Sequence, residues 1–270
     1  MLDRLRLIRA FLIRDLRTEI SYRFSFLLGI IGIIFTAVTY YFVSRLLGDS
    51  VRPLLAPYGG DYFAFALIGV AFASYFTLGL SGFARALRQA QTTGTLEAML
   101  MTPAPVSFVI IGSAAWSYVF TTFRVVVYLL LGIALGMELA NANYWGAVVT
   151  LLIAVSAFAA LGIIAASVIM VIKRGDPVTG LFGGFATLVG GVFYPVEIMP
   201  GWLQAVANLL PITYALRAMR LALLQGASWA TLAPDLIILA AFAIVLLPLS
   251  LLIFSFAVER ARKEGSLAHY

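Results

Sequence analysis

The chain consists mainly of long apolar stretches that follow one another with only short polar breaks. Of its 270 residues, 63% are hydrophobic and 11% are charged, whereas about 25% of the residues of a soluble domain are charged. A stretch of roughly 20 apolar residues lets a helix cross the ~30 Å hydrocarbon layer of a membrane. Because lipid offers the backbone no hydrogen-bond partners, such a stretch must be helical. The sequence therefore predicts an all-α integral membrane protein.

Six stretches have the composition of transmembrane helices. They cover residues 24–44, 61–83, 106–136, 145–172, 178–193 and 230–258. The fifth is barely long enough to cross, and Pro234 and Pro248 interrupt the sixth. No polar segment is long enough for a separate soluble domain, so we expect residues 1–270 to form a single transmembrane domain.

The distribution of positive charge predicts the orientation. Residues 1–23 carry six arginines with apolar residues at helical spacing, which is typical of a helix along the membrane surface, although a disordered basic leader is the alternative. Thirteen of the 18 Lys and Arg residues lie in this leader, in the breaks after the second and fourth stretches, and in the tail. This excess places both termini and both breaks in the cytoplasm. The net charge of +6 thus indicates topology rather than binding of nucleic acid. The other five are Arg45, Arg52, Arg217 and Arg220 on the opposite side, and Arg124 within the third stretch.

The longest interior break covers residues 85–103, RALRQAQTTGTLEAMLMTP. Gly94 suits a helix N-cap, with Glu97 near the positive end of the helix dipole. Pro103 ends the helix because the residue before a proline avoids the α region. One face would carry Leu96, Met99 and Leu100. We expect a short amphipathic helix in the cytoplasm, which either receives a partner protein or simply connects two spans.

Residues 193–215 are too apolar for a free loop and contain too many prolines for a span. Pro200 suits the first turn of a helix that Pro211 ends, and Trp202 suits a membrane interface. We therefore predict a re-entrant hairpin from the outer face. A second outer helix over residues 212–225, ended by Gly226, would place Arg217 and Arg220 on one face, where they contact lipid headgroups or a substrate phosphate.

The chain lacks an energy source of its own. It has no cysteine, and its single histidine, His269, lies next to the C-terminus, so thiolate and histidine metal sites are excluded. A phosphate-binding loop needs Gly-Lys-Ser/Thr, but the only lysines, Lys173 and Lys263, follow Ile172 and Arg262. No acidic residue lies in the middle of a predicted span, which argues against an ion-driven secondary carrier. A membrane-embedded enzyme would need a cluster of acids or histidines, and none is found. The energy source is thus expected to be a protein that docks on residues 85–103 and 173–177.

Two segments resemble the membrane subunits of ABC-2 type exporters. They are GTLEAMLMTP at residues 94–103 and FYPVEIMPGWLQAVANLLPITYALRAMR at residues 193–220. The resemblance implies a homodimer in a bacterial inner membrane, bound to two copies of an ATPase that holds ATP and Mg. It implies that residues 85–103 are the coupling helix and that residues 193–215 close the exit. Residues 173–177, KRGDP, would be a smaller second contact.

Candidate site residues follow from this resemblance and from the residue patterns. The coupling residues would be Arg88, Thr95, Leu96, Glu97, Met99, Leu100, Lys173, Arg174 and Asp176, with helix capping as the alternative role of Glu97. The outer gate would be Tyr194, Pro195, Pro200 and Trp202. An amphipathic substrate, namely a drug-like molecule, a lipid or a lipid-linked glycan, would pass Phe72, Phe76, Arg124, Phe182 and Phe185. The alternatives are lipid-facing aromatics and, for Arg124, a structural polar link. The small residues Gly180, Gly184, Thr187 and Gly191 indicate either a dimer seam or packing within one subunit.

Overall fold

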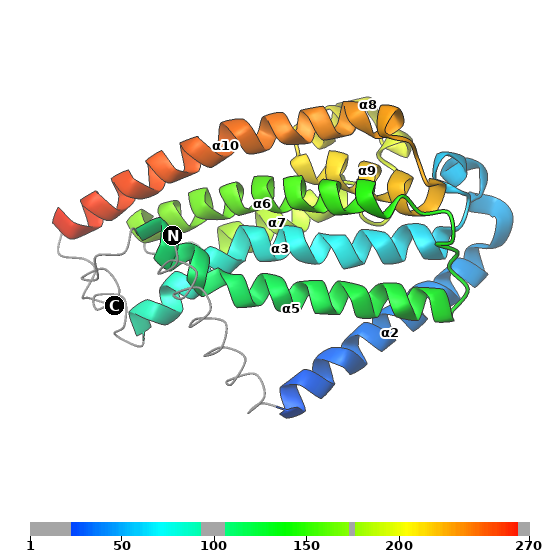
Figure 1. The fold of residues 1–270 in the computed structure, drawn as a ribbon, viewed down its shortest axis with the longest axis horizontal. Helices are drawn as coiled ribbons and strands as arrows, with labels where there is room; N and C mark the ends of the chain where they lie inside the picture. Colours follow the sequence, from blue (N-terminus) through cyan, green and yellow to red (C-terminus); the bar gives the residue numbers. More distant parts are fainter. Residues whose placement is uncertain (1–22, 93–105, 173–175, 264–270) are drawn as a thin grey trace.

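The computed structural model describes residues 23–92, 106–172 and 176–263, and these residues form only helices and connecting turns. Five long helices run side by side along most of the molecule (Figure 1). They are α2 (Arg23–Leu47), α3 (Tyr62–Thr92), α5 (Val106–Ala134), α6 (Tyr144–Ile172) and α10 (Trp229–Lys263). Each contains an apolar section long enough to cross a membrane. The prediction of an all-α membrane protein is confirmed at this level.

Two of these helices are more continuous than the sequence predicts. Helix α3 runs to Thr92, so residues 85–92 of the polar break extend the predicted second span instead of leaving it. Helix α10 continues through Pro234 and Pro248. A proline removes only one helical hydrogen bond, and in lipid every other backbone group still needs its helical partner. In this bundle, neither the polar residues 85–92 nor Pro234 and Pro248 end a helix.

Helix α7 (Asp176–Val189) is shorter than the predicted fifth span over residues 178–193. Its 14 residues are about 21 Å long at 1.5 Å per residue, so the helix alone does not cover the ~30 Å hydrocarbon layer, and the chain reaches the outer hairpin only after the turn that follows it. The helix is followed by a turn in which Gly191 has φ of +85°, a conformation that glycine adopts without strain. The described residues thus contain five candidate spans and one shorter apolar helix.

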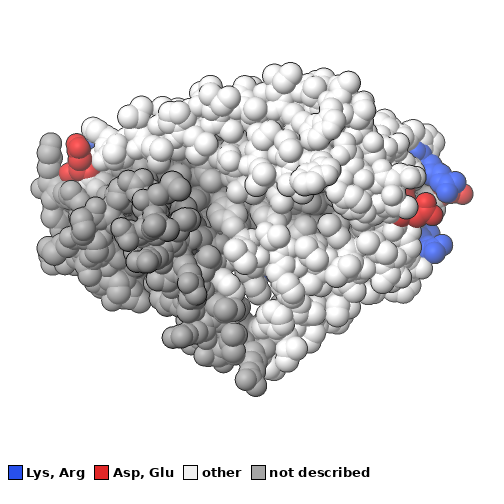
Figure 2. Space-filling view, viewed as in Figure 1, with Lys and Arg blue, Asp and Glu red and all other residues white. Residues whose placement is uncertain are grey.

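The remaining elements lie at one end of the bundle. The 3-10 helices η1 (Gly48–Val51) and η2 (Pro53–Tyr58) connect α2 to α3 at the end opposite to the last residues of α3, α6 and α10 (Figure 1). We name these the outer end and the inner end, after the charge asymmetry of the sequence. Charged atoms gather at both ends, and the described surface between them is uncharged in the view of Figure 2.

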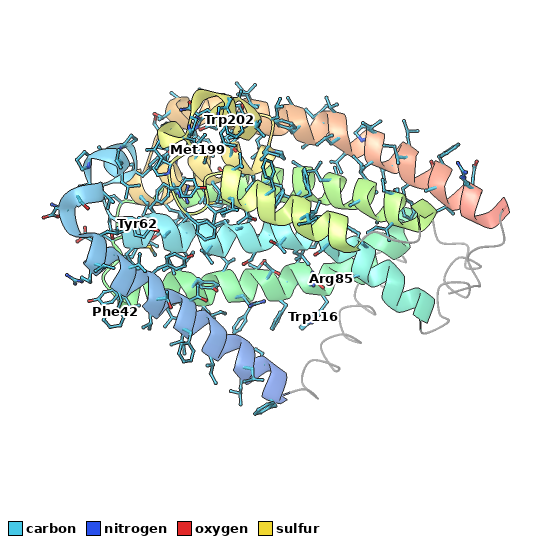
Figure 3. All side chains as sticks on the ribbon, turned by 180° about the vertical axis from the view of Figure 1, so that it is seen from behind. Phe42, Tyr62, Arg85, Trp116, Met199 and Trp202 are labelled. Carbon is cyan, nitrogen blue, oxygen red and sulfur yellow. The ribbon has the colours of Figure 1, made fainter. Side chains whose placement is uncertain are left out.

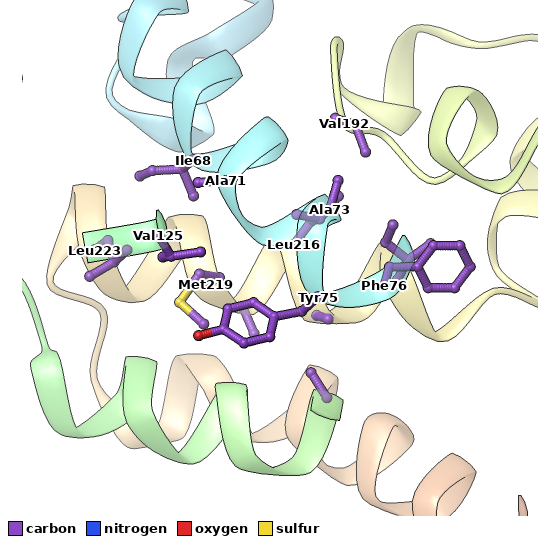
Figure 4. Close-up of a cluster of buried hydrophobic side chains, with 14 of the residues drawn as sticks. Ile68, Ala71, Ala73, Tyr75, Phe76, Val125, Val192, Leu216, Met219 and Leu223 are labelled. Carbon is purple, nitrogen blue, oxygen red and sulfur yellow. The ribbon is translucent and has the colours of Figure 1, made fainter. Parts of the chain in front are cut away.

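Helix α3 is the centre of the bundle. In the apolar window of its span Tyr62–Arg85, 78% of the residues are buried, compared with 11% and 17% in the windows of the α2 and α10 spans. Apolar side chains of α3 pack against α5, α9 and the turn after α7 (Figure 4). Where α3 crosses α6, a Cβ atom on Gly162 would overlap the carbonyl oxygen of Gly79. The two helices therefore touch backbone to backbone, as small residues allow in membranes.

The outer hairpin comprises η3 (Val196–Ile198), α8 (Gly201–Ala207) and α9 (Pro211–Gln225). The predicted helix over residues 212–225 is confirmed to within one residue. Pro211 occupies the first turn, and Gly226 ends the helix with φ of +57°. Helix α9 is buried along most of its length and packs against α6, α10 and α3. It is thus part of the core rather than an interfacial helix.

Candidate functional site

A groove of about 790 Å³ lies between α3 and α5, with α2 and α7 at its sides. Its α3 wall contains Val70, Ala73, Ser74, Thr77, Leu78, Gly82 and Arg85. Its α5 wall contains Trp116, Ser117, Phe120, Thr121 and Arg124. The spacing of three or four residues in both sets puts each on one face of its helix. Tyr40, Thr187, Val192 and Phe193 complete the lining.

The groove presents hydrogen-bond donors and positive charge. Neither aspartate nor glutamate occurs among the described residues that line it. The indole nitrogen Nε1 of Trp116 is buried and makes no hydrogen bond within the described part of the chain. Arg124 is half-buried and lies near the middle of the span Trp116–Ala134, where a charge costs about 2.5–3.5 kcal/mol on insertion scales. The groove gives this guanidinium a polar surrounding within the membrane section.

The two ends of the groove differ. At the outer side, the rings of Tyr40 and Phe193 stack with centroids 6.4 Å apart and planes tilted by 18°. Toward the inner side, Arg85 of α3 and Trp116 of α5 lie away from Tyr62, which marks the outer end of α3 (Figure 3). Since Ser74 and Arg85 are 11 residues apart on one helix, the α3 wall extends for about 16 Å between them. The groove is therefore elongated along the bundle axis.

The structure brings together only part of the predicted substrate path. Arg124 lines the groove, whereas Phe76 is fully buried with its ring edge-on to Phe158. The prediction for Phe76 is corrected, because its face of α3 is used to pack against α6. Phe72 is half-buried and stacks on Tyr75. Phe182 and Phe185 of α7 and the ring of Phe72 are not among the groove-lining residues.

Sequence reasoning missed several residues of this groove. Ser117, Thr121 and Arg124 are spaced by four and three residues, so the polar stripe on α5 was visible in the sequence. Tyr40 and Phe193 come from distant parts of the chain, and no local pattern predicts their stacking.

Two glycines of α7 face outward, whereas Gly183 is buried next to Leu80 of α3. Gly180 and Gly184 are exposed, and a Cβ atom on either would meet nothing within 4 Å. These two residues therefore do not serve close packing within the described chain. Thr187 instead lines the groove and donates its hydroxyl to the carbonyl of Gly183 at 2.7 Å. Gly191 is corrected as a seam residue, because it is buried in the turn after α7.

The predicted gate residues lie along the outer hairpin in different surroundings. Pro195 is buried and Tyr194 half-buried, whereas Pro200 is exposed next to the first residue of α8. Trp202 on α8 is 70% exposed, and it lies at the periphery of the bundle near Met199 (Figure 3). Gln204 fixes the bend of this segment by donating to the carbonyl oxygens of Glu197 and Met199 at 3.1 and 2.8 Å.

Arg220 corrects the prediction of lipid contact, because it is only 3% exposed. Its Nε donates to the carbonyl oxygen of Phe65 at 3.1 Å, and its Nη1 and Nη2 donate to those of Gly191 and Val192, each at 2.7 Å. The guanidinium also lies 3.4 Å from the ring centroid of Phe65. A Cβ atom on Gly69 would overlap both Arg220 and the Val192 carbonyl. Arg220 therefore joins α9 to α3 and to the turn after α7.

Two further polar pairs surround this arginine. Arg217 forms a bidentate ion pair with Asp235 of α10, and Asp235 is 4% exposed. The hydrogen bonds to Asp235 raise the pKa of Arg217. The Tyr58 hydroxyl donates to Glu197 Oε1 at 3.4 Å, and burial, followed by the charge of Glu197, raises the pKa of Tyr58 to about 12. Burial lowers the pKa of Arg220 to about 9, so it stays protonated at neutral pH.

Most of the predicted coupling residues lie outside the described residues. These are Thr95, Leu96, Glu97, Met99, Leu100, Lys173 and Arg174. Arg88 belongs to the inner part of α3, and Asp176 is the first residue of α7. The described helices that flank them have their near ends, namely the last residues of α3 and α6 and the first residues of α5 and α7, at the inner end of the bundle (Figure 1).

Comparison with known proteins adds one finding on the family. The profile of the ABC-2 type transporter family matches residues 6–224, which is most of the chain. No curated protein matches the sequence. The matched range covers α2 to α9, and hence the residues that line the groove as well as Arg217 and Arg220. The chain therefore belongs to the ABC-2 type transporter family, whose members are membrane components of ABC transporters.

Proposed function

We propose that the chain is the membrane subunit of an ATP-driven exporter in a bacterial inner membrane. Two copies of the chain bind two copies of a separate ATPase, which holds ATP and Mg. The ATPase acts on the coupling segment at residues 85–103, with residues 173–177 as a smaller contact. An amphipathic substrate leaves through the outer face when the hairpin after α7 moves.

The observation that carries this proposal is the combination of family membership with a chain that has no energy site of its own. The sequence lacks a phosphate-binding loop. Within the described residues, no group of three or more His, Cys, Asp or Glu could hold a metal ion. Among the described residues, Asp235 is the one carboxylate buried in a candidate span, and it is already paired with Arg217. A compensated carboxylate is a poor site for a coupling proton or sodium ion.

The α7 surface supports the proposed dimer. Gly180 and Gly184 form a smooth strip next to the exposed side chains of Leu181, Phe185 and Leu188. Small residues let two membrane helices approach closely, so that backbone and side chains gain van der Waals contact. The strip has no partner within the described chain, and a second copy would cover it.

The decisive experiment is reconstitution of the chain in liposomes with and without an ABC ATPase subunit that co-purifies with it. Transport of a fluorescent amphiphile should require both the ATPase and hydrolysable ATP. Equal transport without the ATPase, or transport that follows a proton or sodium gradient, would contradict the proposal and indicate a secondary carrier.

A charge reversal tests the coupling segment. Glu97→Lys should reduce substrate-stimulated ATPase activity at least tenfold, because a positive charge at residue 97 would oppose the positive end of the helix that the sequence predicts there. Glu138→Lys is the matched control, since Glu138 is exposed in the outer turn between α5 and α6. Equal activities of the two variants would show that residues 85–103 do not transmit the work of the ATPase.

A further inference from the structure

The described lining of the groove between α3 and α5 combines arginine side chains with apolar residues and contains no carboxylate. We propose that it binds an anionic amphiphile, whose phosphate, sulfate or carboxylate head pairs with Arg124 while its hydrocarbon tail lies along the apolar lining. This inference deepens the proposed function by naming the substrate class, and its role in transport rests on that proposal. Binding itself requires neither ATP nor a partner.

The charge of Arg124 is the first argument. Its guanidinium makes no hydrogen bond or ion pair with another side chain in the described ranges, and the groove around it contains no carboxylate there. Arg45 and Arg217, by contrast, contact Tyr41 and Asp235. A half-buried cation in a membrane span is stabilised by a counter-charge, and a bound anion supplies one. A planar guanidinium also matches the oxygens of a phosphate, sulfate or carboxylate in a bidentate geometry.

Trp116 is the second, independent argument. Its buried Nε1–H donates to no group in the described part of the chain, and buried polar groups in native structures are nearly always hydrogen-bonded. Trp116 lies on the same helix as Arg124, eight residues away, or about 12 Å along the axis. Phe120 lies between Trp116 and Arg124 on the same wall, so the groove offers a ligand an apolar contact between two hydrogen-bond donors.

The shape and the lining fit a tail as well as a head. The volume of about 790 Å³ lies within the range of small-molecule sites, roughly 300–1,000 Å³. Val70, Leu78, Phe120 and Val192 offer apolar surface along its length. The stacked rings of Tyr40 and Phe193 lie toward the outer side, and from Arg124 the groove continues along the bundle axis past Phe120 and Leu78.

Equilibrium binding tests this inference on the full-length chain in nanodiscs of zwitterionic lipid. The probe is radiolabelled dodecyl phosphate, and empty nanodiscs give the background. Dodecyl maltoside has the same tail with a neutral head, and inorganic phosphate has the head without the tail. We expect saturable binding of dodecyl phosphate, which neither competitor displaces at tenfold higher concentration. Displacement by dodecyl maltoside would contradict the proposal, because it would show that the tail alone is recognised. Displacement by inorganic phosphate would contradict it as well, because it would show that the head alone is recognised.

Variants assign the binding to named residues. Arg124→Gln should weaken dodecyl phosphate binding at least tenfold, whereas Arg124→Lys, which keeps the charge, should weaken it by less than threefold. The matched control, Arg45→Gln, should bind as the original chain does, because Arg45 does not line the groove. Binding should also shift the wavelength of tryptophan emission, because Trp116 lines the groove, and Trp116→Phe should remove most of this shift.

Two results would overturn the inference. One is the absence of saturable binding, and the other is unchanged affinity of Arg124→Gln when its melting temperature equals that of the original chain. The inference and the proposed function can fail separately. Binding that depends on Arg124 without ATP-driven transport would refute the exporter, whereas ATP-driven transport of a neutral amphiphile by Arg124→Gln at the original rate would refute the anionic substrate class.

Discussion

Replacement of Arg220 by methionine tests whether this arginine holds the outer hairpin to the bundle. Methionine keeps much of the length of the side chain but has neither the charge nor the N–H groups. Three carbonyl oxygens would lose their donor, those of Phe65, Gly191 and Val192. The last two lie outside helices and accept no other backbone hydrogen bond in the described chain.

The expected loss follows from these contacts. A hydrogen bond from a charged donor contributes about 1.5–3 kcal/mol, and a desolvated cation over an aromatic ring about 2 kcal/mol. Relief from burying the charge offsets part of this sum. Removal of one partner from a buried charged network typically costs about 3–5 kcal/mol, and we expect Arg220→Met to fall in this range. At roughly 2–4 °C per kcal/mol, the midpoint of thermal unfolding should fall by about 6–20 °C.

The assay is thermal unfolding of the purified chain in one neutral detergent, followed by circular dichroism. Arg52→Met is the matched control, because the Arg52 side chain is 70% exposed and pairs only with Asp49. Surface pairs of this kind contribute at most about 1 kcal/mol. Arg220→Lys should be intermediate, since an ammonium keeps the charge but cannot reach three carbonyls in a fixed fork. Equal unfolding midpoints for Arg220→Met and Arg52→Met would refute the view that this cluster is a structural anchor.

Two further predictions concern glycines. Gly162→Ala should destabilise the chain by about 1–3 kcal/mol in the same assay, because the added methyl group overlaps the backbone of α3. Gly29→Ala is the control and should leave the stability unchanged, because nothing lies within 4 Å of its Cβ position. Equal unfolding midpoints for the two variants would contradict the described crossing of α3 and α6. Gly184→Leu should convert the proposed dimer to monomer in analytical ultracentrifugation. Ala241→Leu, on an exposed position of α10, should leave the proposed dimer intact. Persistence of a dimer in Gly184→Leu would place the seam elsewhere.

The sequence predicts the spanning helices well because lipid imposes a simple rule. Hydrophobic length alone identified α2, α3, α5, α6 and α10, and the ends of α5 and α6 lie within two residues of the prediction. The failures have the same physical origin. A helix whose backbone must remain bonded does not end at the first polar residue, so α3 continues to Thr92. A short apolar stretch can also end as a helix at a glycine turn, and α7 stops at Val189, before the end of the predicted span.

The site was predictable only where its residues share one helix. Arg217 and Arg220 were assigned to one face of α9, and this spacing is correct. Their partners come from α10, α3 and the turn after α7, so that no local pattern distinguishes a buried anchor from a headgroup contact. Arg124 was recognised as unusual because a charge inside an apolar span is rare. The shape of the groove around it depends on how α3 and α5 pack.

The continuity of α3 has a mechanical consequence. From Thr92 at the inner end to Phe65, whose carbonyl receives Arg220, the helix contains no proline and no change of helix type. This distance of about 40 Å is one rod. Because the rod is fastened at its far end to α9 and to the turn after α7, a displacement of Thr92 is delivered to the opposite face of the membrane without passing through a joint. A partner that displaces the inner tip of α3 would therefore also displace α9 and the turn after α7, to which Arg220 joins α3.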